Sequence, residues 1–286
     1  MKIALIGDLH YPSVVINRPE VLKARDAFFE HLLTAFLQTE ADFHISIGDL
    51  TNVGELSEFA YVFNKVQSCG ERVRFIHVMG NHDTYTNAKA EVLAATGQEP
   101  YGLIEADEAN LILLDTARET VTDWSGFMED EQLAWLENAV RQHPDKPLLV
   151  FAHHPIYGTT ARSQETMMSL HESVDLRSIL NQHNGTGLYF NGHNHINSIV
   201  EEAGWYYVQT AAPLDMPAFR LITIQNGQVD VELVQLEDEK VKEWADIVSR
   251  HMPFYEPYAP AAGDEFSLSL SVRTKQGYSI VDEASR

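Results

Sequence analysis

Cysteine is almost absent from this sequence: Cys69 stands alone among 286 residues, so no disulfide bond can form within one chain. Such sparing use of cysteine favours a reducing compartment, and we expect a cytoplasmic protein. Lys2 is followed by only four apolar residues before Gly7, a run too short for the apolar part of a secretory signal peptide. No apolar run approaches the length of a membrane span, so we expect no membrane partner.

Basic side chains are also scarce. The chain has 20 lysine and arginine residues against 42 acidic residues, which gives a formal net charge of −22. A chain this acidic repels nucleic-acid backbones at long range, so we expect no nucleic-acid duplex partner and disfavour a nuclease. A small phosphate ester is not excluded, because bound metal ions would reverse the local field.

The apolar pattern of the first two thirds of the chain alternates between strands and helices. Strands are predicted over residues 3–6, 43–47, 74–78, 111–114, 148–152 and 188–190, and helices over residues 19–39, 55–68, 87–95, 129–141 and 172–182. Closely spaced strands follow over residues 196–201, 205–210, 219–225 and 228–234. The pair Asn226-Gly227 predicts a tight hairpin between the last two strands. This order predicts an α/β protein with two packed sheets and helices outside.

The last fifty residues differ in composition from the rest. We expect one domain over residues 1–236 and a C-terminal extension over residues 237–286. Within it we predict an exposed charged helix over residues 238–250, a linker or clasp over residues 251–263, and a half-buried strand from Phe266 to Val272. Three placements of the extension remain open: on the domain, over a cleft, or across the interface of a homo-oligomer.

Polar clusters follow five of the predicted strands. They are Asp8-x-His10, Gly48-Asp49, Gly80-Asn81-His82-Asp83, His153-His154 and Gly192-His193-Asn194-His195. Open α/β sheets bind ligands at the carboxyl ends of their strands. Each cluster alone is compatible with an ordinary turn, but five in one chain predict a common site.

The residue types indicate a metal site without thiolate ligands. Imidazole, carboxylate and amide oxygen together suit Mn, Fe, Zn or Co. The candidate ligands are too many for one ion and would serve two ions if Asp49 bridges them. They are Asp8, His10, Asp49, Asn81, His153, His193 and His195.

In this order the five clusters resemble the motifs of the calcineurin-like metallophosphoesterase superfamily, over about two thirds of the chain (residues 8–195). The resemblance implies a four-layer α/β/β/α sandwich of two mixed sheets. It also implies a centre of two ions, with Mn²⁺, Fe²⁺ or Fe³⁺, and Zn²⁺ as the candidates. A shorter stretch, Gly48-Asp49-Leu50-Thr51-Asn52, together with Gln132-x-x-Trp135-Leu136, resembles the bacterial class III cyclic-nucleotide phosphodiesterase branch, in which Asp is common at the position of Asn52.

The resemblance also assigns roles to individual residues. Asp8, His10 and His195 would hold the first ion, and Asn81, His153 and His193 the second, with Asp49 between them. His82 would act as general acid or electrostatic stabiliser, oriented by Asp83. His153 is preferred over His154 as the ligand because it lies two positions before a proline. His154 would then lie behind the ligands or line the cleft, and Asn194 is a candidate for facing the substrate.

The leading hypothesis is therefore a two-metal phosphodiesterase for a small diester of the cyclic-nucleotide or glycerophosphodiester type, in which a hydroxide bridging the ions attacks phosphorus in line. A phosphomonoesterase or protein phosphatase of the same superfamily is the alternative among enzymes. A non-catalytic metal-binding scaffold is disfavoured, because no ligand position is missing and His82 is present.

Overall fold

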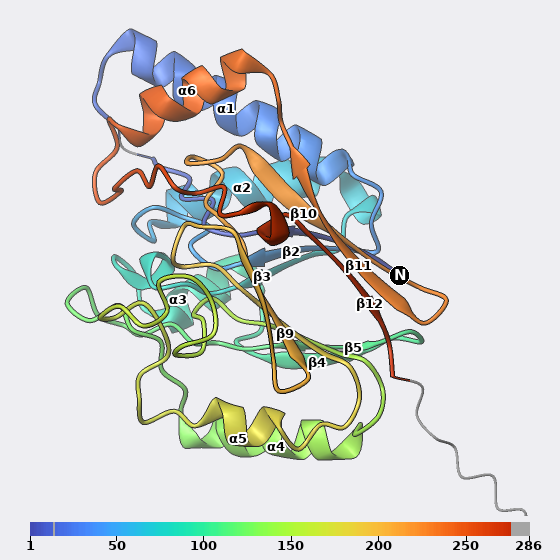
Figure 1. Cartoon of the computed structure of the whole chain (residues 1–286). Coiled ribbons are helices and arrows are strands. Elements are labelled where there is room, and N and C mark those ends of the chain that lie inside the picture. The colour runs from blue at the N-terminus through green and yellow to red at the C-terminus, as the bar shows by residue number, and fades with distance from the viewer. Residues whose placement is uncertain (14, 276–286) are drawn as a thin grey trace, which may run out of the picture.

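The computed structural model describes residues 1–13 and 15–275, so residues 276–286 of the predicted extension lie outside it. Two six-stranded mixed sheets occupy the centre of the molecule (Figure 1). The first has the order β12 (Ser269–Arg273), β11 (Gln228–Gln235), β10 (Ala218–Gln225), β1 (Lys2–Ile6), β2 (Phe43–Ile47) and β3 (Phe75–Val78). β1, β2 and β3 are parallel, as expected for strands joined by crossover helices.

The second sheet is also mixed, with one antiparallel strand at each edge. Its order is β4 (Gly102–Glu105), β5 (Asn110–Leu113), β6 (Leu148–Phe151), β7 (Gly187–Asn191), β9 (Trp205–Gln209) and β8 (Ser198–Glu202). Four of these strands, β5, β6, β7 and β9, run parallel to one another. The sequence prediction missed β4, a short antiparallel strand at the edge that buries none of its residues fully.

Helices cover the outer face of each sheet. The first sheet is covered by α1 (Pro19–Gln38), α2 (Leu56–Ser68), α3 (Lys89–Thr96) and α6 (Glu239–Ser249), and the second by α4 (Asp130–Gln142) and α5 (Leu176–Leu180). A third apolar cluster lies between the sheets and includes Ile45, Phe151 and Phe190. The predicted four-layer α/β/β/α sandwich is therefore confirmed, although α5 is shorter than the helix predicted over residues 172–182.

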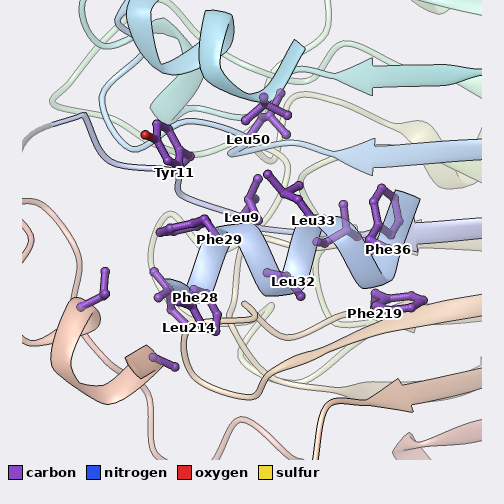
Figure 2. Close-up of a cluster of buried hydrophobic side chains, with 14 of the residues drawn as sticks. Leu9, Tyr11, Phe28, Phe29, Leu32, Leu33, Phe36, Leu50, Leu214 and Phe219 are labelled. Carbon is purple, nitrogen blue, oxygen red and sulfur yellow. The ribbon is translucent and has the colours of Figure 1, made fainter. Parts of the chain in front are cut away.

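Helix α1 shows how the outer layer is fixed. Pro19 occupies its first turn, where no backbone N–H is needed. Phe28, Leu32 and Phe36 recur at helical spacing and point into one buried cluster (Figure 2). The ring of Phe36 meets that of Phe219 on β10 edge to face, with 5.5 Å between centroids. Each such side chain contributes about 1.5–3 kcal/mol through burial.

The described part of the C-terminal extension, residues 237–275, packs on the domain, which is one of the three placements left open by the sequence. Helix α6 lies along α1 (Figure 1) and buries Val241, Ala245 and Val248, so the prediction of an exposed helix was wrong for this face. β12 pairs with β11, but it begins at Ser269 and not at Phe266. Phe266 lies instead in a 3-10 turn, with 74% of its side chain exposed, so the prediction of a strand from Phe266 was wrong at its start.

The predicted hairpin between β10 and β11 is confirmed. Asn226 and Gly227 have φ angles of 54° and 71°, the left-handed pair that a two-residue hairpin turn requires. Among the described residues, no helix combines the length and the apolar character that crossing a membrane demands.

Candidate metal centre

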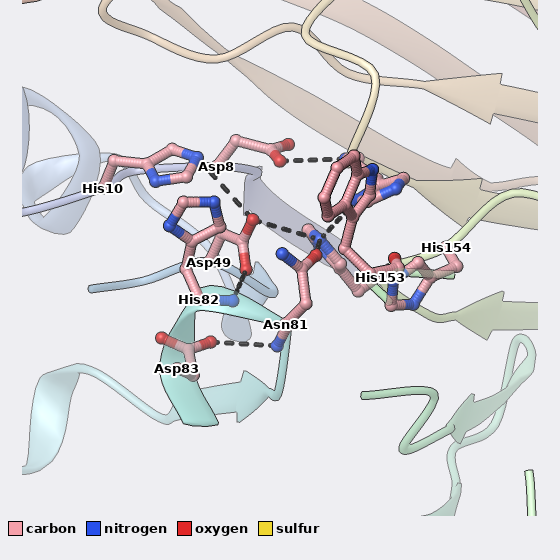
Figure 3. Close-up of polar contacts among 12 residues, drawn as sticks. Asp8, His10, Asp49, Asn81, His82, Asp83, His153 and His154 are labelled. Atoms are coloured by element: carbon pink, nitrogen blue, oxygen red, sulfur yellow. Dashed lines mark hydrogen bonds and ion pairs between the residues drawn. The ribbon is translucent and has the colours of Figure 1, made fainter. Parts of the chain in front are cut away.

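All five polar clusters meet at one end of the two sheets. Asp8, Asp49 and Asn81 follow β1, β2 and β3 of the first sheet, and His153 and His193 follow β6 and β7 of the second. Figure 3 shows Asp8, Asp49, Asn81 and His153 converging on a common space. The fold thus brings together residues that are up to 187 positions apart in sequence, Asp8 and His195.

Three candidate ligands form a first group on one side of this space. Asp8, His10 and His195 each offer a ligand atom within 4.8 Å of the other two. His10 Nε2 lies 3.1 Å from His195 Nε2, and His195 Nε2 lies 3.6 Å from Asp8 Oδ1.

A second group lies on the opposite side. His153 Nε2 is 3.2 Å from Asn81 Oδ1 and 3.2 Å from His193 Nδ1. Asn81 gives its Nδ2 hydrogen to the hydroxyl of Tyr85, which leaves its carbonyl oxygen facing His153.

Asp49 stands between the two groups. Its Oδ2 is 3.6 Å from His10 Nε2 in the first group and 3.2 Å from His153 Nε2 in the second. Its Oδ1 accepts a hydrogen bond of 2.8 Å from the backbone N–H of His82. One carboxylate oxygen therefore faces both groups while the other fixes the side chain.

The imidazoles are oriented with a free nitrogen pointing inward. The outer nitrogens of His153 and His193 donate to the carbonyl oxygens of Ile47 and Met167, at 2.9 and 3.0 Å. His195 Nδ1 lies 3.1 Å from the carboxylate of Asp215. Such partners fix the tautomer and leave the inner nitrogen with a lone pair, as in histidines that bind metal ions.

The electrostatics of the centre also fit bound cations. Burial raises the pKa of Asp8 to about 6, and its Oδ2 has no hydrogen-bond partner among the described residues. Burial lowers the pKa of His10 well below its ordinary value and that of His193 to about 3, which keeps both rings neutral. At His153, by contrast, burial is outweighed by Asp49 and Asp8, which raise the pKa to about 9, so its protonated ring supplies the buried carboxylates with positive charge that a bound cation would otherwise supply.

The backbone is strained at most of the candidate ligands. Five of them have left-handed φ angles: Asp8 (48°), His10 (48°), Asp49 (47°), His193 (71°) and His195 (53°). This conformation costs a residue with a Cβ roughly 1–2 kcal/mol. Such strain is concentrated at functional sites, where the surrounding structure enforces it.

Two glycines of the motifs give the carboxylates their room. A Cβ at Gly80 would overlap the carboxylate of Asp49, and a Cβ at Gly192 would overlap that of Asp8. The first residue of Gly-Asn-His-Asp and of Gly-His-Asn-His must therefore be glycine, because the carboxylates of Asp49 and Asp8 lie too close to these positions for a Cβ atom.

The choice between His153 and His154 rests on their free nitrogens. His154 is fully buried, with Nδ1 bonded to Thr116 Oγ1 at 2.9 Å and Nε2 to the carbonyl oxygen of Trp124 at 3.0 Å. Both of its nitrogens are therefore taken, whereas His153 Nε2 faces Asp49. His154 thus lies behind the ligands, the first of the two placements expected for it, and it is not among the residues that line the cleft, so the expectation of a substrate contact is not met.

Asn194 is also turned away from the centre. Its side chain is buried and donates to the carbonyl oxygens of Ala161 and Met168, at 3.1 and 3.2 Å. These bonds hold the loop of residues 161–168 against the last motif. The prediction that Asn194 faces the substrate is therefore wrong, because its polar atoms are directed into the protein.

His82 and Asp83 separate in space although they are neighbours in sequence. His82 lines the cleft, and its Nδ1 lies 2.7 Å from the backbone oxygen of Asn52. Asp83 instead accepts hydrogen bonds from the N–H and hydroxyl of Thr51 and the N–H of Gly80, at 2.7–2.9 Å. Asp83 thus holds two motif loops together, and its predicted role of orienting the ring of His82 was wrong.

The strongest omission of the sequence analysis is Asp215, the partner of His195. It lies between β9 and β10, outside every motif, and nothing in the local sequence marks it. Asp215 and Asp8 oppose the effect of burial at His195, so that the pKa of this histidine is raised.

A cleft of about 790 Å³ opens above the metal ligands. His10, Asp49, Asn81, His82, His193 and His195 form its floor, and its walls are Val53, Tyr85, Thr86, Val121, Trp124, Arg162, Met168, Phe254, Tyr255, Glu256, Pro257 and Tyr258. The cleft combines a polar floor of candidate metal ligands with walls that are mostly aromatic or apolar, which is the usual composition of a small-molecule site.

Solved structures with this architecture include a purple acid phosphatase from yellow lupin seeds, with a TM-score of 0.55, 12% identity, and coverage of 96% of this chain and 53% of that one. Another is the protein described as GAP50, the anchor in the inner membrane complex of Plasmodium, with a TM-score of 0.52, 13% identity, and coverage of 84% and 86%. At these identities the likeness concerns the fold alone.

Two curated relatives match more closely in sequence. A probable cyclic nucleotide phosphodiesterase of Rhodopseudomonas palustris is 35% identical over 130 residues, which are 44% of this chain and 46% of the relative. A probable glycerophosphodiester phosphodiesterase of Arcobacter nitrofigilis is 28% identical over 162 residues, or 54% and 57%. The chain thus spans about half the length of these relatives, and they agree with the resemblance to the bacterial class III branch.

The family model described as Calcineurin-like phosphoesterase matches residues 1–197, a range that contains all five polar clusters and both ligand groups. Family model, fold and converging motifs all agree, and this chain belongs to the calcineurin-like phosphoesterase family.

Proposed function

We propose that the protein is a metal-dependent phosphodiesterase that holds two ions and hydrolyses small phosphodiesters. The observation that carries the proposal is the position of Asp49 Oδ2, which faces His10 Nε2 at 3.6 Å and His153 Nε2 at 3.2 Å. One oxygen shared by two ligand groups is the arrangement that a pair of ions roughly 3.5–4 Å apart requires.

The donor set indicates which ions suit the site. Asp8, His10 and His195 would hold one ion, Asn81, His153 and His193 the other, and Asp49 would contact both. Imidazole nitrogens mixed with carboxylate and amide oxygens suit Mn²⁺, Fe²⁺ or Fe³⁺, and Zn²⁺. When bound, such ions supply Lewis-acid charge for the phosphoryl oxygens and activate water at neutral pH.

His82 is the residue that we assign to proton transfer or charge stabilisation. A carbonyl oxygen only accepts hydrogen bonds, so His82 Nδ1 carries a proton that it donates to Asn52. The other nitrogen is then the one that exchanges a proton at the cleft. Burial lowers the pKa of His82, which makes its protonated form a stronger acid toward a leaving alkoxide.

Two relatives bear names of phosphodiesterases, one for cyclic nucleotides and one for glycerophosphodiesters. A diester of one of these types is therefore the substrate class that we propose. The cleft volume of about 790 Å³ matches a small ester, so it supports a small-molecule substrate and not a long polymer.

The test is a substrate panel run with Mn²⁺: cyclic nucleotides, glycerophosphodiesters, nucleoside diphosphate conjugates, monoesters and a generic aryl diester. We expect a diester to be cleaved fastest, and activity to disappear on chelation and return with Mn²⁺. His82→Ala should lower turnover of the aryl diester by at least about 100-fold. The control is His31→Ala, which removes an exposed histidine of α1.

Three results would contradict the proposal. Activity that survives exhaustive chelation would exclude metal dependence. A monoester cleaved faster than every diester would favour the phosphomonoesterase alternative. A His82→Ala protein with the turnover of the His31→Ala control would remove the role assigned to His82.

A further inference from the structure

After helix α6 the chain returns to the metal centre. Residues 253–258, which we call the C-terminal strap, lie beyond the last metal-binding motif, and Phe254, Tyr255 and Tyr258 line the cleft together with His10 and His195. The strap is connected to histidines of the centre in three separate ways.

The first connection is the ring of Tyr255. Its centroid lies 5.0 Å from that of His10, edge to face, and 5.1 Å from that of His195, with the two planes tilted by 31°. These separations are those of favourable aromatic contacts. Tyr255 therefore rests on two of the three candidate ligands of the first group, and restricts the rotation of both rings.

The second connection runs through Asp215. Its Oδ1 accepts a hydrogen bond of 3.0 Å from the backbone N–H of Tyr258, while its Oδ2 lies 3.1 Å from His195 Nδ1. One carboxylate thus joins the strap to a candidate ligand. Because a strap N–H holds the carboxylate, the position of the strap fixes the direction in which the ring of His195 points.

The third connection runs through Asn52. Its side-chain Nδ2 donates to the carbonyl oxygen of Pro253 at 2.8 Å, and its own backbone oxygen faces His82 Nδ1 at 2.7 Å. The start of the strap is thereby tied to the residue that supports His82.

The strap is held at Tyr258, its last residue, and by a hydrogen bond to Ala261, three residues beyond it. Asn197, two positions after His195, donates its backbone N–H to the carbonyl oxygen of Ala261 at 2.8 Å. Arg162 stacks over the ring of Tyr258, with its guanidinium carbon 4.4 Å from the centroid. Among the described contacts of the strap, none involves His153 or His193, so its effect is confined to one side of the centre.

We propose that the C-terminal strap is a positioning element of the metal centre, and that Tyr255 orients His10 and His195 for the first ion. The proposal rests on the proposed function in one respect, the presence of two ions. It extends the functional part of the chain beyond the motifs, because the strap contacts two of the three ligands in the group of Asp8, His10 and His195.

The test is a calorimetric titration of the chelator-treated full chain with Mn²⁺ alone. Tyr255→Ala should weaken one of two binding steps by about 10- to 100-fold and leave the other unchanged. The weakened step should be the one that persists in His153→Ala, which removes a ligand of the second group. Tyr255→Phe keeps the ring and should bind as the wild type does, as should Phe266→Ala, which removes an exposed aromatic side chain from the same extension.

Kinetics with the aryl diester give a second readout. A positioning role predicts a lower kcat for Tyr255→Ala at saturating Mn²⁺, with KM changed less than about twofold, since the substrate would not contact a residue that only orients ligands. A raised KM with unchanged kcat would overturn the proposal, because Tyr255 would then bind substrate instead. So would two Mn²⁺ steps of wild-type affinity in Tyr255→Ala.

If Tyr255→Ala does not fold, the variant Asp215→Asn tests the same proposal. The amide can still accept from the N–H of Tyr258, but its NH₂ group cannot accept from His195 Nδ1. The same step should weaken, and wild-type affinity in this variant would equally overturn the proposal. A wild-type protein that binds Mn²⁺ in two steps yet cleaves no diester would refute the proposed function while leaving the comparison of the variants intact.

Discussion

Arg220→Met should destabilise the protein strongly, although Arg220 contacts no candidate metal ligand. The Arg220 side chain on β10 is fully buried, and the described residues place no carboxylate within ion-pairing distance of it. Its guanidinium donates instead to neutral oxygens from three parts of the chain. These are Thr210 Oγ1 (3.1 Å), Asn197 Oδ1 (3.0 Å), Gln209 O (3.0 Å), Ser267 O (2.9 Å) and Leu268 O (3.4 Å).

The magnitude follows from the acceptors that the substitution leaves behind. Asn197 Oδ1 and Leu268 O each keep a second donor, the backbone N–H groups of Ala211 and Leu233. The other three acceptors lose the guanidinium, and an unsatisfied buried acceptor costs about 1–3 kcal/mol. Removing a buried cation offsets part of this cost, since burial lowers the pKa of Arg220 to about 9. We therefore expect a loss of about 3–5 kcal/mol.

Thermal unfolding measures this loss. At about 2 °C per kcal/mol for a chain of this length, the melting temperature should fall by about 6–10 °C. The matched control is Arg273→Met on β12, an exposed arginine of the same sheet, which should melt within about 1 °C of the wild type. An Arg220→Met protein that melts as the control does would refute the cost assigned to the buried acceptors that Arg220 satisfies.

The remaining predictions concern the metal centre. Mn²⁺ added at a free concentration of 100 Kd should stabilise chelator-treated protein by about 2.7 kcal/mol and raise its melting temperature by about 5 °C. An unchanged melting temperature would contradict cation binding. The raised pKa of Asp8 means that the protonated carboxyl favours the folded state, and this contribution to stability is lost as the pH rises from about 4 through 6. In chelator-treated protein, Asp8→Asn should therefore melt at a higher temperature than the wild type at pH 8 but not at pH 4. Gly80→Ala, but not Gly102→Ala, where a Cβ has open space, should lose most of its metal by elemental analysis.

The sequence predicts those parts of the fold that depend on local patterns. The strand of residues 43–47 has apolar side chains at every second position, Phe43, Ile45 and Ile47, and all three enter the core between the sheets. The Asn226-Gly227 turn carries its own conformational signal. The metal motifs are visible for the same reason, because each one follows a strand directly. Helix α6 was misjudged as exposed even though Val241, Ala245 and Val248 have the spacing of one buried helical face.

The sequence does not predict contacts made by residues without a local pattern. Asp215 and Tyr255 are single residues in irregular segments, and their partners lie 20 to 245 positions away. Asp83 illustrates the opposite error. It is adjacent to His82, but in the 3-10 turn of residues 82–84 consecutive side chains leave the backbone in different directions, so sequence adjacency wrongly suggested contact.

The metal centre also joins the two sheets. Asp8, Asp49 and Asn81 come from the first sheet, whereas His153, His193 and His195 come from the second. Hydrogen bonds cross the same boundary: His193 N–H donates to Asp8 at 2.8 Å, and His153 Nδ1 donates to Ile47 at 2.9 Å.

The left-handed backbone at five candidate ligands lies in loops that are held by hydrogen bonds both within the first sheet, such as those of the Asp8 and His10 N–H groups, and between the sheets. Packing of the apolar layer between the sheets sets the distance across which the ligands face one another. Binding of ions that contact both groups should in turn hold the sheets together, because ions that bind only the folded arrangement stabilise it. Stability of the sandwich and geometry of the centre are thus two consequences of the same packing.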